Sequence, residues 1–256
     1  MKIPRIVPRN FLIENLYFYR KSSIIFWGDE MYKYETHLHT FPVSRCAKAD
    51  VKESLDFYKK LGYDGVFITN HFLDGNINIE KEKTYEEKID FYFSDFEKGV
   101  ELGKTIGIKV FCGVELSYGG TDFLVYGLNK EWFLSHPEIM DMKKSDELTF
   151  MMDNGALIIQ AHPYREASYI DHIRLFPKSV HGVEVVNASR TEQENKMANI
   201  YAQNYNLIEF AGSDNHSASK QKKLAGVCCE KPICNIKDFI SKVKDNKIKI
   251  FTFINE

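Results

Sequence analysis

The feature that most constrains the fold is an alternation of short apolar runs with longer stretches of helical spacing. In the longer stretches, apolar residues recur as on one face of a helix, for example at Val51, Leu55 and Tyr58. The predicted strands cover 32–40, 65–71, 109–118, 156–163, 181–187, 208–216 and 248–253, with a hairpin turn at Gly119-Gly120, and the predicted helices cover 51–61, 85–106, 144–154, 191–205 and 235–245. Because this alternation is typical of a parallel sheet, the sequence predicts an α/β fold, either open or closed into a barrel.

The predicted strands share a second property, which is a histidine or an acid at the carboxyl end. These residues are His37 and His39, His71, Glu115, His162, and Asp214 and His216. In a closed parallel barrel the carboxyl ends of all strands meet on one face, where the active sites of such folds lie. In an open sheet, only the strands near the point where the strand order reverses converge. Five such strand ends therefore favour a closed barrel.

The spacing within the first and last of these groups indicates metal binding. Residues i and i+2 of a strand point to the same side, so His37 and His39 project together, as do Asp214 and His216. A mixture of imidazole and carboxylate ligands is typical of zinc, manganese or iron sites. Glu115 has two carboxylate oxygens and is the natural bridge between two cations. A single histidine at a strand end is more often structural, but the joint pattern indicates a site for several metal ions.

Composition and charge narrow the range of partners. The formal net charge is -2 and no basic stripe is visible, which argues against long nucleic acids and anionic membranes as partners. No run approaches the ~18 apolar residues that span a bilayer. Five cysteines without a C-x-x-C pair indicate reduced thiols and a cytoplasmic location. We expect residues 1–30 to be an N-terminal extension and 31–256 to be one catalytic domain.

Five short motifs, in order along the chain, resemble the PHP domain, which is named for polymerase and histidinol phosphatase. The motifs are HLHT (37–40), ITNH (68–71), GVEL (113–116), AHP (161–163) and GSDNH (212–216). The resemblance implies a distorted (β/α)7 barrel with its metal site at the carboxyl ends of the strands. It also implies two or three divalent metal ions (zinc, manganese or iron) and hydrolysis of a small phosphate ester.

The resemblance also implies a role for each residue of these motifs. The implied metal ligands are His37, His39, His71, Glu115, His162, Asp214 and His216. Glu115 would bridge the first two metals, and His71 and His216 would face a third. A metal-bound hydroxide would attack phosphorus. We expect Asp214 and Arg165 to be the catalytic residues.

The first departure from the family pattern lies directly after HLHT. The family commonly has Ser-Asp-Gly there, with the aspartate on the third metal, but residues 40–46 contain no acid. Cys46 is a candidate soft ligand in its place. Alternatively, Arg45 occupies the space and binds substrate, or the third site is weak or empty.

Further departures concern Asn70 and the second metal. Asn70 stands where the family usually has aspartate, so it can orient His71 by hydrogen bonding but adds no basicity. The family typically takes another ligand of the second metal, a histidine or cysteine, from the strand after AHP. That stretch is VEVVN (183–187) in this chain, and it makes Glu184 or Asn187 the candidate.

The arginines near the motifs are candidates for binding the phosphate group of the substrate. Arg165 follows AHP closely, and a guanidinium group binds phosphate oxygens in a bidentate manner, so Arg165 is a candidate phosphate clamp and substrate-binding residue. The alternative is that Arg165 pairs with Glu166 or another acid at the rim. Arg190 is a weaker candidate, since it could equally lie in the first turn of a helix without a role in chemistry.

Three functions fit these residues. The leading hypothesis is a metal-dependent phosphoesterase acting on a sugar phosphate, a nucleotide or an amino-alcohol phosphate. The second is an amide or ester hydrolase of the same barrel type, because the same nucleophile can attack a carbonyl carbon. The third is a metal-binding module with little catalysis, which the missing acid in 40–46 and Asn70 both favour.

Overall fold

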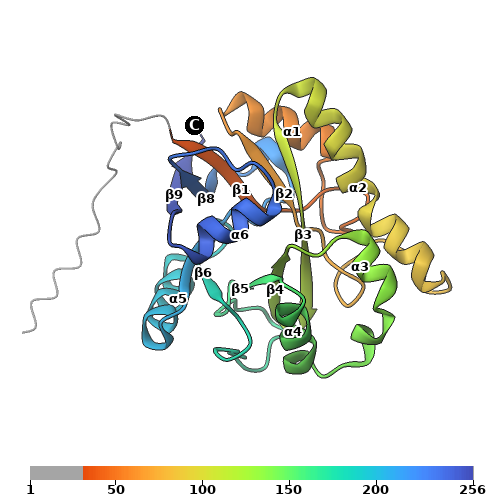
Figure 1. Cartoon of the computed structure of the whole chain (residues 1–256). Coiled ribbons are helices and arrows are strands. Elements are labelled where there is room, and N and C mark those ends of the chain that lie inside the picture. Colours follow the sequence, from red (N-terminus) through yellow and green to blue (C-terminus); the bar gives the residue numbers. More distant parts are fainter. Residues whose placement is uncertain (1–30, 256) are drawn as a thin grey trace, which may run out of the picture.

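The structure is a computed structural model that describes residues 31–255; the predicted extension, residues 1–30, lies outside the described residues (Figure 1). The strands are β1 (Tyr32–Leu38), β2 (Gly65–Ile68), β3 (Lys109–Tyr118), β4 (Thr121–Tyr126), β5 (Leu157–Ala161), β6 (Gly182–Asn187), β7 (Ile208–Gly212), β8 (Lys223–Cys229) and β9 (Lys249–Ile254). The helices are α1 (Val51–Lys60), α2 (Tyr85–Ile106), α3 (Lys130–Ser135), α4 (Lys144–Asp153), α5 (Glu192–Tyr205) and α6 (Ile236–Lys244), with two short 3₁₀ segments at Pro137–Asp141 and Ala218–Lys220. The predicted order of elements is confirmed, while α3 and β8 are additions to it.

Local sequence signals explain where the long helices begin and end. At the start of α2, the Thr84 side chain accepts from Glu87 N, and the Glu87 carboxylate accepts from Thr84 N, which is a capping box. A second capping box of the same kind precedes α5. α2 ends at Gly107, whose φ of 78° lies in the left-handed region that glycine adopts most readily.

One sheet contains all nine strands, in the order β7-β6-β5-β4-β3-β2-β1-β8-β9. Its neighbours pair in parallel, except that β4 and β8 run antiparallel to both of their neighbours. The sheet therefore has nine strands in the described part of the chain, not the seven that the resemblance implies. The difference arises because the turn at Gly119-Gly120 folds β4 back along β3, and because β8 is inserted between β1 and β9 and pairs antiparallel with both.

The two ends of the sheet approach each other, so the sheet is a nearly closed barrel. His39 N donates to Asn215 O (2.9 Å), and Asn215 N donates to His37 O (3.1 Å), which joins the segment after β7 to the end of β1. Ser213 Oγ, next to β7, donates to Ala225 O of β8 (2.9 Å). Closure brings the first and the last of the sequence motifs side by side.

Large apolar side chains pack together in the barrel and come from almost every strand. This cluster contains Tyr34, Phe67, Phe111, Leu124, Tyr126, Leu157, Ile159, Phe210 and Val227. Helix α6, which crosses in front of the sheet in Figure 1, packs Phe239 and Val243 into the same cluster. Burial of each such side chain contributes roughly 1.5–3 kcal/mol. No helix within residues 31–255 is long and apolar enough to cross a membrane.

Candidate metal centre

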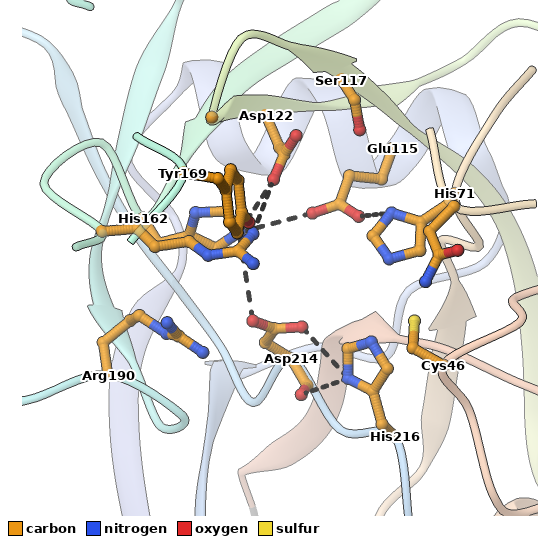
Figure 2. A pocket seen from close by; sticks show the side chains of 13 residues that line it. Cys46, His71, Glu115, Ser117, Asp122, His162, Tyr169, Arg190, Asp214 and His216 are labelled. Carbon is orange, nitrogen blue, oxygen red and sulfur yellow. Dashed lines mark hydrogen bonds and ion pairs between the residues drawn. The ribbon is translucent and has the colours of Figure 1, made fainter. Parts of the chain in front are cut away.

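Three carboxylates and five histidines meet on one face of the barrel, at the carboxyl ends of the parallel strands and at the amino end of the antiparallel strand β4. They are His37 and His39 at the end of β1, His71 after β2, Glu115 in β3, Asp122 in β4, His162 after β5, and Asp214 and His216 after β7. Figure 2 shows those that line the cavity: His71, Glu115, Asp122, His162, Asp214 and His216. The structure therefore brings together all seven residues that the sequence indicated as ligands, and it adds Asp122. Since these side chains come from strands as far apart in the strand order as β1 and β7, the closure of the barrel assembles the cluster.

The first group consists of His37, His39, Glu115 and Asp214. His37 Nε2 lies 3.1 Å from His39 Nε2 and 3.0 Å from Glu115 Oε1. His39 Nε2 lies 3.4 Å from Asp214 Oδ1. A tetrahedral ion with bonds of about 2.1 Å sets its ligand atoms about 3.4 Å apart. The spacing of these four side chains therefore fits one divalent cation between them.

Hydrogen bonds behind the two imidazoles fix which nitrogen faces the cluster. His37 Nδ1 lies 3.0 Å from Glu184 Oε1 and donates to it. Ser44 Oγ donates its one proton to Asn70 Oδ1 (2.8 Å), so it accepts from His39 Nδ1 (3.1 Å). Both rings thus carry a proton on Nδ1 and turn a lone pair of Nε2 toward the other ring. Two such lone pairs at this distance favour a cation between them.

Glu115 has the position expected of a bridging carboxylate. It is buried, and neither of its oxygens accepts a hydrogen bond within the described residues. Its Oε2 lies 2.7 Å from His71 Nδ1, and its Oε1 lies 3.5 Å from His162 Nε2. Burial opposes the charged form of Glu115, but the positive charge of His71 and His37, when these rings are protonated, outweighs it and holds the pKa of this carboxyl well below its usual value. Glu115 is therefore a buried carboxylate that faces several candidate ligands at once.

The sequence did not predict Asp122, which forms a second group with His162 and Glu115. Asp122 is buried in β4, and its Oδ2 lies 3.6 Å from His162 Nε2. The signal that could have identified it is an acid in the otherwise apolar strand TDFLVY, directly after the hairpin turn. Burial is the largest cause that raises the pKa of Asp122. A cation beside it would offset that cost.

A third group is formed by His39, His71 and His216, whose rings lie close together. His216 Nδ1 lies 3.0 Å from Asp214 O and donates to it. Cys46 lines the same cavity beside these rings (Figure 2). Burial opposes ionisation of the Cys46 thiol, but hydrogen bonds with His216 and His71 lower its pKa to about 6. The Cys46 thiol thus lies beside the third group, to which residues 40–46 contribute no acid.

Glu184 and Asn187 do not occupy the position that the sequence predicted for them. Both oxygens of Glu184 are used behind the cluster, because Oε1 accepts from His37 Nδ1 and Oε2 accepts from His162 N (3.1 Å). Asn187 Nδ2 donates to Glu184 Oε2 (2.8 Å). Glu184 therefore orients candidate ligands. The position beside His162, which we expected Glu184 or Asn187 to fill, is taken by Asp122 from β4.

Asn70 acts on the histidines indirectly. Its Oδ1 accepts from Thr40 N (2.7 Å) and from Ser44 Oγ, and Ser44 Oγ in turn accepts from His71 N (3.1 Å). The buried acid nearest to Asn70 is Asp95 of α2, whose Oδ2 accepts from Thr40 Oγ1 (2.7 Å) and Asn70 Nδ2 (3.4 Å). The PHP family usually has an aspartate at the position of Asn70. In this chain the carboxylate is that of Asp95, which lies one hydrogen bond further from the cluster.

The backbone is strained at two candidate ligands. His162 has a φ of 27° and Asp214 a φ of 53°, both in the region that residues other than glycine rarely adopt. Such conformations persist only where the surroundings fix them, and they concentrate at functional sites. At His162, the hydrogen bond from its N–H to Glu184 is one such constraint.

A cavity of about 380 Å³ opens in front of the cluster and includes two arginines in its lining. Arg165 Nη1 lies 3.3 Å from Asp122 Oδ2, so Arg165 pairs with this acid rather than with Glu166, which is exposed. Arg190 lies beside His162 at the edge of the cavity (Figure 2). Arg45 is exposed and is not part of the lining, so the structure does not bring it to the cluster.

Comparisons with known proteins bear on the fold. No protein-family model matches the sequence, and no curated protein matches it. Among solved structures, a two-domain protein from Bacteroides vulgatus that contains a predicted PHP-like metal-dependent phosphoesterase superimposes with a TM-score of 0.65 at 16% identity. That match covers 87% of this chain, and this chain spans 65% of the length of that protein.

Two further structures share the fold. PsfC from Pseudomonas syringae matches with a TM-score of 0.57 at 15% identity, over 88% of this chain and 92% of its own. An amidohydrolase from Chromobacterium violaceum, with bound sulfate and no metal, matches with a TM-score of 0.50 at 14% identity, over 84% of this chain and 97% of its own.

The fold is that of the solved structures described above, a distorted α/β barrel, and this chain carries a cluster of imidazoles and carboxylates at one face of that barrel. Since one of these structures contains a predicted PHP-like domain, the resemblance seen in the five sequence motifs is confirmed at the level of the fold.

Proposed function

We propose that this protein is a metal-dependent phosphoesterase that hydrolyses a small phosphate ester. Residues 31–256 are the catalytic domain in this proposal. The observation that carries it is the pair of guanidinium groups in the cavity, because the Nε atoms of Arg165 and Arg190 are buried and have no hydrogen-bond partner within the described residues. Guanidinium groups bind phosphate oxygens through several N–H donors at once.

The balance of charge in the cavity supports an anionic substrate. The carboxylates that face the cavity are Glu115, Asp122 and Asp214. Two divalent cations and two guanidinium groups together carry more positive charge than these three acids compensate. A phosphate group supplies the missing negative charge, whereas a neutral amide does not. The phosphoesterase is therefore favoured over the amide or ester hydrolase.

Each part of the cluster has a role in the proposed reaction. The four side chains of the first group, His37, His39, Glu115 and Asp214, would hold one cation, and Glu115, Asp122 and His162 would hold a second. Bound divalent cations supply a water of lowered pKa and polarise a phosphoryl oxygen. Asp214 is the candidate to accept the proton of the attacking water, and Arg165 is the candidate to bind the phosphoryl oxygens.

A third cation position is proposed at His71, His216 and Cys46. Two imidazoles and a thiolate form a soft ligand set, which prefers zinc or iron(II) to magnesium. Elemental analysis of the purified chain after dialysis measures the number of bound ions. Two or three ions per chain support catalysis, and one or none favours the metal-binding module.

The function is tested with a panel of phosphomonoesters and phosphodiesters in the presence of manganese or zinc. We expect turnover by the wild-type chain and its loss in a His37→Ala/His39→Ala double variant. His136→Ala is the matched control, because His136 lies next to the surface 3₁₀ segment Pro137–Asp141 and outside the cavity. Turnover of amides or lactones without turnover of phosphate esters would instead establish the amide or ester hydrolase.

A further inference from the structure

The lining of the cavity contains one large carbon surface within the described residues, the ring of Tyr169. Imidazoles, carboxylates, guanidinium groups and small side chains make up the other parts of this lining. Tyr169 is 66% exposed, although it borders a cavity whose floor is buried. A phosphate ester has a charged half and an organic half. The polar lining suits the charged half, which leaves the ring of Tyr169 to contact the organic half.

The segment that carries this exposed ring is held in place by its neighbours. Ile170 packs so closely on the β3–β4 turn that a Cβ atom at Gly120 would lie 2.6 Å from Ile170 Cγ1. Arg174 of the same segment donates a hydrogen bond to Gly119 O. The ring of Tyr169 is therefore presented on an anchored loop, and a surface fixed in this way binds a ligand with a smaller loss of conformational entropy.

The ring lies next to the candidate phosphate clamp. The guanidinium carbon of Arg165 lies 5.7 Å from the centroid of the Tyr169 ring, in a cation–π arrangement. The same guanidinium group contacts Asp122 at 3.3 Å. A phosphoryl group bound by Arg165 and by the cations that the carboxylates would hold therefore has its ester oxygen, and the group attached to it, on the side of Tyr169.

We propose that Tyr169 is a specificity-determining residue that stacks on a planar aromatic ring in the organic half of the substrate. The preferred substrates are then phosphate esters that carry an aromatic ring, rather than esters of aliphatic alcohols or sugars alone. This inference rests on the proposed phosphoesterase function and names its substrate class. Stacking of a planar ring on an aromatic side chain raises affinity by about tenfold or more.

The test compares two ligands that cannot be hydrolysed at the phosphorus–carbon bond, phenylphosphonate and methylphosphonate. Their dissociation constants are measured by calorimetry on the full chain loaded with manganese. We expect the wild type to bind phenylphosphonate about tenfold more tightly. Tyr169→Phe should keep this preference, and Tyr169→Ala should reduce it to less than about twofold. Tyr205→Ala is the matched control, because Tyr205 is also exposed but lies on α5 and not in the cavity lining.

The possible outcomes separate this inference from the function on which it rests. Equal binding of both ligands by the wild type, or an aromatic preference that survives in Tyr169→Ala, overturns the role of Tyr169 and leaves the anion site intact. Failure of both ligands to bind overturns the phosphoesterase proposal, and the role of Tyr169 with it. Loss of the preference in Tyr205→Ala would show that it arises elsewhere and would overturn the role of Tyr169.

Discussion

At the scale of single residues, the buried acids divide into two groups according to what their oxygens contact. Glu115 and Asp122 face imidazoles and the cavity, and their oxygens accept few or no hydrogen bonds from the backbone. Glu35 and Glu184 instead use their oxygens on N–H groups of the segments that carry candidate ligands; Glu35 Oε1 accepts from both His37 N (2.8 Å) and Ser213 N (3.0 Å). The first group is available to cations, and the second group holds in place the segments that carry His37, His162 and Asp214.

This division predicts different effects of replacing Asp122 and Glu184. Asp122→Ala should lower the metal content after dialysis by about one ion per chain, because it removes a ligand. Glu184→Gln should keep the number of ions but weaken their affinity by about 10- to 100-fold, because it removes no ligand and alters only how His37 and His162 are held. Elemental analysis and competition with a chelator measure both quantities. A full complement of metal in Asp122→Ala would exclude it as a ligand.

A buried ion pair outside the centre predicts a dependence of stability on pH. Lys144 Nζ lies 2.6 Å from Glu147 Oε2 and 2.8 Å from Asp74 Oδ2. Burial raises the pKa of Glu147 to about 7, although Lys144 opposes the shift. Because the folded state then binds this proton more tightly than the unfolded state, the free energy of unfolding should fall as pH rises from about 4.5 to about 7.

Glu147→Gln should remove this part of the pH dependence. The difference in unfolding free energy between about pH 5 and about pH 8 should shrink by about 2 kcal/mol in the variant. Urea denaturation at the two pH values measures it. Glu101→Gln replaces an exposed acid of α2 and serves as the control. An unchanged difference in Glu147→Gln would contradict the assigned shift.

At the scale of secondary-structure elements, antiparallel pairing decides which side chains reach the centre. The β3–β4 hairpin pairs Asp122 with Ser117 and, on its other side, β4 pairs Asp122 with Ala161, the residue before His162. This register places an acid from β4 directly beside a histidine that follows β5. If the strand after β3 ran parallel to β3, its carboxyl end would lie on this face of the barrel. An acid near its start, where Asp122 stands in β4, would then lie at the opposite face.

The close approach of β7 to β1 yields a prediction at Gly212. A Cβ atom at Gly212 would lie 2.5 Å from His37 Cβ and 2.6 Å from Glu184 Oε1. Gly212→Ala should therefore lower the free energy of unfolding by about 1–3 kcal/mol and displace His37. Gly99→Ala in α2 is the control, because its nearest neighbours are methyl groups at 3.0–3.2 Å and alanine favours a helix. Equal effects of the two substitutions in urea denaturation would refute the close contact at Gly212.

At the scale of the whole molecule, the candidate ligands connect strands that lie far apart in the order of the sheet. His37 belongs to β1, and Asp214 follows β7, the strand at one end of the strand order. A cation held by both therefore closes the barrel more firmly. Binding to the folded state alone also stabilises it by mass action.

Metal binding should accordingly raise the thermal stability of the protein. At a free metal concentration about 100-fold above the dissociation constant, the expected gain is about 2.7 kcal/mol, or roughly 5–10 °C in Tm. Thermal unfolding followed in manganese and in a chelator measures the difference. The His37→Ala/His39→Ala variant should lose most of it, and a wild-type Tm that does not respond to metal would contradict a centre at this position.

The sequence by itself determined the order of strands and helices and the strand ends at which candidate ligands stand. These features follow from local backbone geometry, because the helical and strand periods, the i, i+2 spacing of His37 and His39, and the capping boxes depend on neighbours along the chain. The α/β barrel and the seven clustered residues could therefore be predicted before the coordinates were known.

Only the tertiary structure decided which other polar side chains face the cavity. Glu184 and Asp122 are both acids in predicted strands, but pairing between strands turns Asp122 toward His162, while the irregular register of β6 and β7 after Glu184 leaves Glu184 behind His37. The same holds for Arg45, which is exposed, and Arg165, which contacts Asp122. These outcomes depend on contacts between residues far apart in the chain, and no local spacing records them.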